Sequence, residues 1–180
     1  MKFSKRISNP RAHARSVLAE LQIKGAPIPV DYIAERRGIH VRRIKLEDGL
    51  SGMIFLKDSQ PIVVINANHH RNRQRFTLAH EIGHFELHMH DIGSEIHVDK
   101  KFYALARDAN SSMGFDRKEI EANRFAAELL VPRDMLAAQL KARSINIGYD
   151  DSIDEITDVL AQAFDVSRQM MAIRIGELLG

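Results

Sequence analysis

The segment His80-Glu81-Ile82-Gly83-His84 lies within a long run of helical periodicity, and it constrains the fold more than any other feature of the chain. Two histidines four residues apart share one face of a helix, one turn apart, so both imidazoles can reach a single ion. Zinc accepts imidazole nitrogens at about 2.0–2.1 Å, and a catalytic zinc site keeps one position for water. Glu81 directly follows the first histidine, where its carboxylate can take a proton from that water. The pattern therefore predicts His80 and His84 as zinc ligands and Glu81 as a general base.

Two surface histidines that meet by chance are the alternative interpretation of this motif. The residues around them are apolar, namely Phe76, Leu78, Ala79, Ile82, Phe85 and Leu87. The histidines should therefore be partly buried, and buried imidazoles need partners, which a metal supplies. Seven of the nine histidines also fall between residues 69 and 97. Burial and clustering together favour the metal site.

The third protein ligand must be a histidine or a carboxylate, because the chain contains no cysteine. His90 follows His84 by six residues, as the third histidine does in the metzincin pattern, but that pattern has a glycine where this chain has Leu87. A branched residue resists the turn that brings the chain back toward the ion. His88 is two turns beyond His80 on the same helix, too far along the axis to share its ion.

A second helical segment, residues 116–130, offers the remaining candidates. Glu119 and Asn123 are four residues apart and share a face, so one can bind the ion while the other orients a ligand histidine. Glu121 points to a different face, and Glu128 lies two turns further along. A single helical glutamate is ordinarily part of a solvated face, but the pairing with Asn123 favours Glu119. His90 and Glu121 remain open as alternatives.

Two stretches of the sequence together resemble the ImmA/IrrE family of metallo-endopeptidases. They are Arg75–His84 and Glu119–Pro132, and the likeness continues upstream in Ile28–Ala34 and downstream in Phe164–Arg174. It therefore covers most of the chain. The departure is the long segment between His84 and Glu119, which carries extra histidines and leaves the shape of the substrate cleft open.

The resemblance implies a gluzincin-like zinc peptidase with one Zn²⁺ per chain, held by His80, His84 and Glu119, with Glu81 as the general base. Relatives in this family act on helix-turn-helix repressors, so the resemblance implies such a regulator as the protein substrate. A group that stabilises the oxyanion is also required. Tyr103, His97 and His70 are candidates, and the sequence does not choose among them.

The coarse periodicity predicts an α+β fold, in which a small antiparallel three-stranded meander packs against a mostly helical zincin-like domain. Strands are expected at residues 39–46, 50–56 and 62–65, and the last should be the most buried because it is apolar on both faces. Helices are expected at residues 9–24, 30–37, 69–88, 116–130, 133–143, 152–164 and 167–179.

Length and composition set the class of protein. With 180 residues, 44% hydrophobic and 28% charged, residues 1–180 are expected to form one globular domain. No stretch suits a membrane span and no secretory signal is visible, so a cytoplasmic location is expected. The formal net charge of +2 is too small to indicate a nucleic-acid-binding protein.

The C-terminal helical pair, residues 151–180, has the appearance of a helix-turn-helix. Arg168, Gln169 and Arg174 are on the second helix where a DNA reader needs them, but the first helix is acidic and would repel phosphate. The pair is therefore expected to pack as part of the peptidase domain, and direct binding of nucleic acid is not expected. Arg71, Arg73 and Arg75 are likewise expected to pair with acidic side chains elsewhere in the fold.

Two functions of different classes fit the sequence. The first is a zinc endopeptidase with a narrow protein substrate, a helix-turn-helix regulator. The second is a non-catalytic, metal-stabilised antagonist of a regulator, such as one member of a toxin–antitoxin pair. The presence of Glu81 favours the enzyme, because a pure binder needs no base at that position.

Overall fold

The computed structural model describes residues 9–47, 49–88, 97–99, 113–143 and 153–179. Seven helices and four strands lie in these ranges. In chain order they are α1 (Pro10–Glu20), α2 (Val30–Arg36), β1 (His40–Ile44), β2 (Gly52–Lys57), β3 (Gln60–Asn66), α3 (Arg71–His88), β4 (His97–Asp99), α4 (Met113–Leu130), α5 (Arg133–Ala142), α6 (Ile153–Phe164) and α7 (Arg168–Leu179). Every predicted helix and strand is present, and the predicted α+β class is confirmed.

The sheet has the strand order β1-β3-β2-β4. The β2–β3 hairpin turns through Asp58 and Ser59, whose φ angles of 50° and 63° give the positive φ at both central residues that a tight hairpin turn requires. β3 lies between two neighbours, with Val63 opposite Val41 of β1 and Ile54 of β2. The prediction that β3 is the most buried strand is confirmed, since residues 62–66 are all buried.

The predicted antiparallel meander is wrong. β1 pairs with β3, and the pairing is parallel, so β1 and β2 form no hairpin, and β4 adds a fourth strand on the other side of β2. The buried Asn66 provides the reason. Its side-chain amide donates to the carbonyls of Leu50 (2.8 Å) and Glu47 (3.2 Å), and its oxygen accepts from the amide of Leu46. The connection between β1 and β2 is therefore held at the end of β3. It passes over that end, so that β3 lies between β1 and β2 in the sheet.

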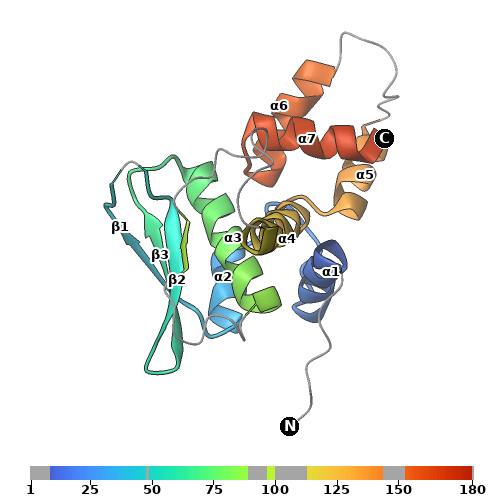
Figure 1. The fold of residues 1–180 in the computed structure, drawn as a ribbon. Coiled ribbons are helices and arrows are strands. Elements are labelled where there is room, and N and C mark those ends of the chain that lie inside the picture. Colours follow the sequence, from blue (N-terminus) through green and yellow to red (C-terminus); the bar gives the residue numbers. More distant parts are fainter. Residues whose placement is uncertain (1–8, 48, 89–96, 100–112, 144–152, 180) are drawn as a thin grey trace.

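The helices lie in layers on one side of the sheet (Figure 1). α3 packs against β2 and β3, α2 packs against β1 and α3, and α4 packs on the side of α3 away from the sheet. α1 lies against α4, and α6 and α7 pack against each other at the end reached through α5. α3 is thus enclosed between sheet and helix, which places the middle of this helix in the interior.

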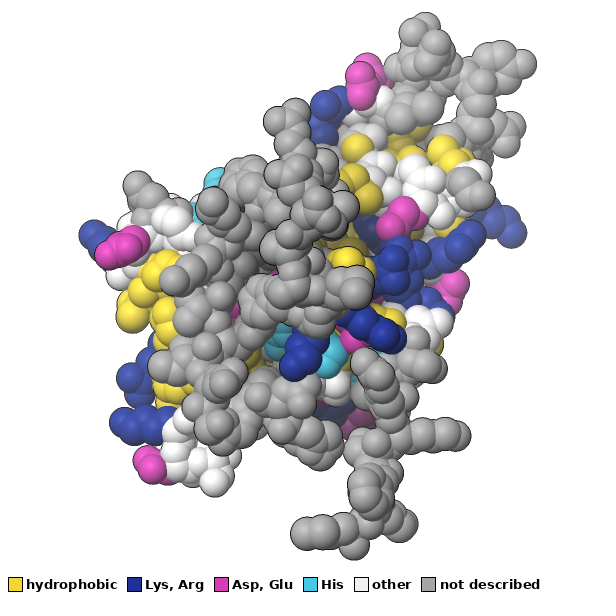
Figure 2. Space-filling view, viewed as in Figure 1, with side chains coloured by type: hydrophobic (Ala, Val, Ile, Leu, Met, Phe, Trp, Pro, Cys, Tyr) yellow, Lys and Arg dark blue, Asp and Glu magenta, His cyan; other side chains and the backbone are white. Residues whose placement is uncertain are grey.

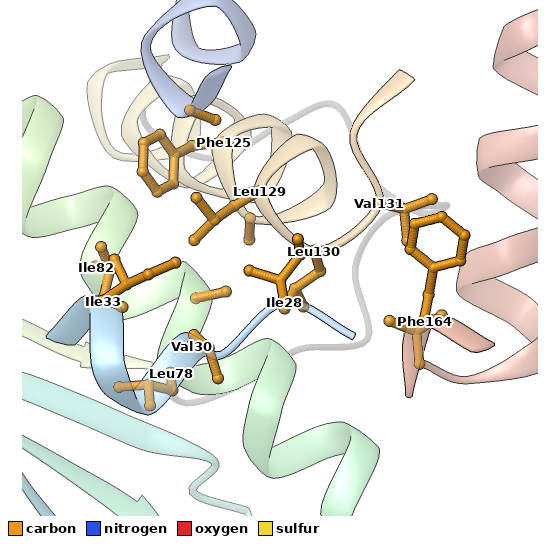
Figure 3. Packing of buried hydrophobic residues seen from close by; sticks show 14 of the residues in the cluster. Ile28, Val30, Ile33, Leu78, Ile82, Phe125, Leu129, Leu130, Val131 and Phe164 are labelled. Atoms are coloured by element: carbon orange, nitrogen blue, oxygen red, sulfur yellow. The ribbon is translucent and has the colours of Figure 1, made fainter. Parts of the chain in front are cut away.

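One cluster of buried hydrophobic residues runs from α1 to α7. At its centre Ile82 of α3 faces Phe125 and Leu129 of α4, and Leu78 of the same helix lies beside Val30 of α2 (Figure 3). Further along, Phe164 at the end of α6 lies beside Val131 (Figure 3). The contact between α3 and α4 is therefore apolar at its core, and that core fixes the spacing of any polar groups at its edge.

In the part of the chain that the structure describes, no helix is both long enough and apolar enough to cross a membrane.

Candidate metal centre

The middle of α3 presents His80 and His84 on one face, and both are almost fully buried, at 1% and 2% exposure. Their Nε2 atoms are 2.9 Å apart. This follows from the helix itself, since residues four apart lie one above the other. The spacing predicted from the sequence therefore brings two imidazole nitrogens to one point.

Glu119 of α4 completes the cluster. Its carboxylate oxygens lie 3.2 Å from Nε2 of His80 and 3.1 Å from Nε2 of His84. Four ligands on a tetrahedral zinc ion at about 2.0–2.1 Å stand about 3.3 Å from one another. The three groups are therefore within about 0.4 Å of the spacing that a zinc ion requires. Among the described residues, His80, His84 and Glu119 form the one group of three or more possible ligands that converge in this way.

Asn123 orients the first histidine. Its amide oxygen lies 3.0 Å from Nδ1 of His80 and can only accept a hydrogen bond there, so Nδ1 carries the proton. The lone pair of Nε2 then faces Glu119, as a metal ligand requires. Glu119 and Asn123 lie one turn apart on α4, as predicted.

Gly83 allows α4 to come this close. A Cβ atom at Gly83 would lie 3.1 Å from Cδ1 of Phe125 and 3.2 Å from both Cα and O of Ala122. Ala122 is one turn from Glu119, so a bulkier residue at position 83 would push the Glu119 carboxylate away from the histidines. The sequence analysis did not single out Gly83, although a glycine inside a helix often marks such a close approach.

Glu81 lies on the side of α3 that faces the sheet, and it is fully buried. β2 passes beside it at Gly52, where a Cβ atom would lie 3.6 Å from Oε1 of Glu81, 2.5 Å from Cγ2 of Thr77 and 2.9 Å from the carbonyl of Val64. Only glycine fits there. Gly52 was not predicted from the sequence either, and a glycine within a strand was the available signal.

The other candidate ligands are placed elsewhere or lie outside the described residues. His88 faces Glu121, with Nε2 and Oε2 3.5 Å apart, so neither belongs to the cluster. Glu121 also accepts from Nε of Arg117. Glu128 is buried, but it pairs with arginines at the other end of α4. His90 lies outside the described residues.

Of the three oxyanion candidates, only His70 has a described side chain. It is exposed, and its Nδ1 accepts a hydrogen bond from the backbone amide of Asn72 at 3.3 Å. His70 therefore caps the start of α3. Ten helical residues separate it from His80, which is about 15 Å along the axis. His70 is therefore not placed to stabilise an oxyanion at the cluster. Tyr103 and the side chain of His97 lie outside what the structure describes.

The cluster is exposed to solvent at Glu119. Histidine side chains show near the centre of the face in Figure 2, with lysine or arginine side chains next to them. The Glu119 side chain is 23% exposed, in contrast to the histidines. The cluster is therefore more accessible from the Glu119 side than from the side of the histidines.

The arginines at the start of α3 serve the fold. Arg71 and Arg75 both pair with Asp165 between α6 and α7, at 2.7 and 3.3 Å, and Arg75 also donates to the carbonyls of Asp165 and Ile28. Burial lowers the pKa of Arg75, and the Asp165 carboxylate opposes that shift. Arg73 donates to Oγ of Ser51 at 2.8 Å. The expectation of acidic partners is confirmed for Arg71 and Arg75.

Two of the three side chains named as possible DNA readers on α7 are occupied, and the third, Gln169, is exposed. Arg174 is 3% exposed and pairs with the buried Glu128 at 2.5 Å. Arg168 pairs with Asp154 and Asp158 of α6. Ile173 on the same helix lies outside the core and is 48% exposed.

Comparison with known proteins agrees with this geometry. The model of the IrrE N-terminal-like domain, a peptidase family, matches residues 34–176. An uncharacterized immunity region protein 2 of Bacillus phage phi105 is 28% identical over 135 residues, which are 75% of this chain and 78% of that protein. A Mycobacterium tuberculosis transcriptional regulator shares the fold with a TM-score of 0.58 and 16% identity, over 90% of this chain and 44% of the regulator. This chain thus spans less than half of that regulator. The match over residues 34–176, which include both histidines and Glu119, shows that the chain belongs to the IrrE N-terminal-like domain family of peptidases.

Proposed function

We propose that this protein is a zinc-dependent endopeptidase that hydrolyses a peptide bond in a specific protein substrate, a helix-turn-helix transcriptional regulator. One observation carries the proposal. His80, His84 and Glu119 converge at distances that suit one ion, with a general-base candidate, Glu81, next to the first histidine. The peptidase family to which the chain belongs supports the same reaction.

The donor set suits zinc. Two imidazole nitrogens and one carboxylate are three protein ligands, and a catalytic zinc site leaves the fourth position to water or substrate. The chemistry that zinc supplies in such a site is a lowered pKa for water and polarisation of the scissile carbonyl. Asn123 holds His80 in the tautomer that binds metal, and the buried contact at Gly83 holds Glu119 in reach.

Glu81 acts on protons in this scheme. Its carboxylate takes a proton from the attacking water and later delivers that proton to the leaving amine. The side chain is fully buried beside Gly52 of β2, so its position is set by packing and few rotamers are open to it. A base held in this way needs little rearrangement during the reaction.

The family resemblance supports a regulator as the substrate. The phage relative is named for an immunity region, and the fold neighbour is named a transcriptional regulator. We further propose that residues 1–180 act as one domain, which the continuous core from α1 to α7 supports. A DNA-binding regulator as the substrate places the activity in the cytoplasm.

The metal site is tested by zinc content per chain in protein purified without a metal column. We expect about one zinc in the wild type, with binding lost or much weakened in Glu119→Ala. Glu121→Ala is the matched control, because it removes a carboxylate from the same helix outside the cluster. Zinc retained at full occupancy in Glu119→Ala would contradict the proposed ligand set and move the third ligand to a residue such as His90.

The reaction is tested with Glu81→Gln, which keeps the shape of the side chain and removes the base. New protein N-termini in a cell lysate, identified by mass spectrometry, should appear with the wild type and be absent with the variant, while zinc content stays the same. Inactivation of a regulator by Glu81→Gln as well as by the wild type would refute the peptidase. That outcome would favour the antagonist, for which contact alone suffices.

A further inference from the structure

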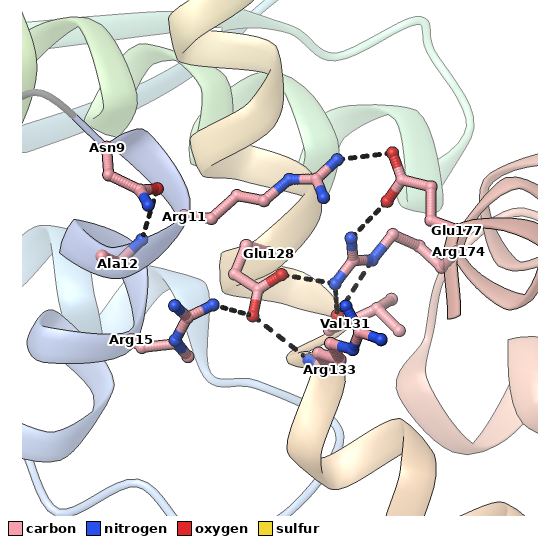
Figure 4. A network of polar contacts seen from close by, with 9 residues as sticks. All are labelled: Asn9, Arg11, Ala12, Arg15, Glu128, Val131, Arg133, Arg174 and Glu177. Carbon is pink, nitrogen blue, oxygen red and sulfur yellow. Dashed lines mark hydrogen bonds and ion pairs between the residues drawn. The ribbon is translucent and has the colours of Figure 1, made fainter. Parts of the chain in front are cut away.

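A second polar site lies at the C-terminal end of α4, beyond the end that carries Glu119. Nine residues separate Glu128 from Glu119 on α4, which is about 13 Å along the axis. Here a cavity of about 210 Å³ lies among α1, α4, α5 and α7. Its charged lining consists of Arg11, Arg15, Glu128, Arg133, Arg174 and Glu177 (Figure 4).

The first carboxylate of this lining is fully occupied by partners within the protein. Glu128 is 1% exposed and accepts from Arg174 at 2.5 Å, from Arg15 at 3.0 Å and from the backbone amide of Arg133 at 3.2 Å. The Arg174 guanidinium also donates to the carbonyl of Val131. This part of the lining is a finished structural network that ties α1, α5 and α7 to the end of α4 (Figure 4).

The second carboxylate is also occupied. Glu177 pairs with Arg11 at 2.6 Å and with Arg174 at 2.5 Å. Neither acid is therefore left to neutralise another cation, and four guanidinium groups face two carboxylates. The lining carries a net charge of +2.

The arginines of this lining still have guanidinium N–H groups without a hydrogen-bond partner among the described residues. No ion pair links the Arg133 guanidinium to any acidic side chain that the structure describes. Arg11 and Arg15 each make one side-chain bond, although a guanidinium has five N–H donors. Nε of Arg11 is buried and has no hydrogen-bond partner among the described residues. A buried donor of this kind costs free energy unless a ligand or water satisfies it.

Two helices begin at this cavity and add to the positive potential. Asn9, the N-cap of α1, and Arg133, the first residue of α5, both line it. The N-terminal end of a helix carries a partial positive charge that favours anions.

We propose that this arginine-lined cavity binds an oxyanion of the phosphate class. Arginine guanidinium groups bind phosphate oxygens through paired N–H donors. The size agrees, because about 210 Å³ is below the roughly 300–1,000 Å³ of pockets for drug-sized ligands and suits a single phosphate group. The bound anion draws α1 and α5 together at the end of α4, so it stabilises the helical layer that carries Glu119. The proposal is independent of the zinc chemistry.

The test is a calorimetric titration of the wild-type protein with inorganic phosphate at constant ionic strength. We expect saturable binding with a dissociation constant that rises about tenfold or more in Arg133→Gln, since a hydrogen bond to a charged group is lost. Arg133 makes no ion pair with the described part of the chain that the substitution would break, so the variant should fold. Arg42→Gln is the matched control, because Arg42 is an exposed arginine on β1, beyond α3.

Each outcome decides the proposal. No saturable binding overturns it, and so does equal affinity in Arg133→Gln, which would show that phosphate binds at the zinc site or non-specifically. Loss in Arg133→Gln with wild-type affinity in Arg42→Gln supports it. A parallel titration with adenosine monophosphate distinguishes the sources of the phosphate group. If adenosine monophosphate binds more tightly than inorganic phosphate, the site takes a phosphate carried by a larger metabolite. If it binds equally or more weakly, the site takes free phosphate.

Discussion

Gly83→Ala should weaken the metal centre without touching any ligand. The added Cβ would lie 3.1 Å from Cδ1 of Phe125 and 3.2 Å from the Cα and carbonyl oxygen of Ala122. The Phe125 ring can give way, but the backbone of Ala122 moves only with α4. We therefore expect α4 to shift outward by a few tenths of an ångström and to carry Glu119 with it.

Two opposing free energies decide the stability of this variant. Alanine in place of glycine within a helix stabilises by about 1 kcal/mol. Overpacking of a core contact costs about 1–3 kcal/mol. The sum is a loss of about 0–2 kcal/mol of unfolding free energy, so stability alone is a blunt measure. Zinc affinity is sharper, because disturbing the support of a ligand typically weakens metal binding by about 10–100-fold.

Gly176→Ala on α7 is the matched control. A Cβ there meets no described atom within 4 Å, so the variant should gain up to about 1 kcal/mol of stability from helix propensity alone. In a domain of this size, that is a rise of about 2–4 °C in Tm. Zinc affinity should stay at the wild-type value, because Gly176 is remote from the histidines.

The assay is urea denaturation of the two metal-free variants together with a competitive zinc titration against a chelating dye. If Gly83→Ala gained stability as Gly176→Ala does and bound zinc as tightly as the wild type, the close approach of α3 and α4 would not set the position of Glu119. The argument from Gly83 would then be wrong.

Two further predictions concern charged contacts outside the metal centre. Arg174→Met should cost about 3–5 kcal/mol in urea denaturation, because it leaves the buried Glu128 without its shortest partner, and a double variant with Glu128→Gln should lose less than the sum of the two single changes. A loss under about 1 kcal/mol would show that the pair is not buried in solution. The hydrogen bonds from Arg37 hold the pKa of Glu20 below its ordinary value of 4.5, so this contact stabilises the fold above that pH, and the contribution is lost as pH falls through the lowered folded-state pKa. Wild type and Glu20→Gln should therefore differ in unfolding free energy at pH 6 and converge in acid, and a constant difference from pH 6 to pH 2 would contradict this.

Much of the candidate site was predictable because it is local. His80 and His84 share a face through the helical period alone, and Glu119 and Asn123 do so for the same reason. The buried strand β3 was also predictable from a short stretch of residues. Each of these features depends on neighbours within a few positions of the chain.

The pairing of strands was not predictable in the same way. Proximity in the sequence favours a hairpin between β1 and β2, but the apolar β3 needs a strand on each side, and the largely exposed β1 takes the outer position. The buried amide of Asn66 holds the crossover, and its partners at residues 46, 47 and 50 are 16 to 20 positions away. Nothing in the residues around Asn66 distinguishes it from an asparagine in an ordinary turn.

By itself, the sequence of this protein determined the helices, the first three strands and which histidines can share an ion, because those properties follow from periodicity along the chain. The short strand β4 was not predicted. Only the tertiary structure decided which distant carboxylate meets the histidines. The pairing with Asn123 favoured Glu119 but left Glu121 open. The packing of α4 against Gly83 brings Glu119 to His80 and His84 and leaves Glu121 beside His88. The packing of α1, α5 and α7 around the end of α4 likewise gathered four arginines around two acids. Contacts of this kind depend on how the helices pack against each other, and that packing is set by side chains from all parts of the core.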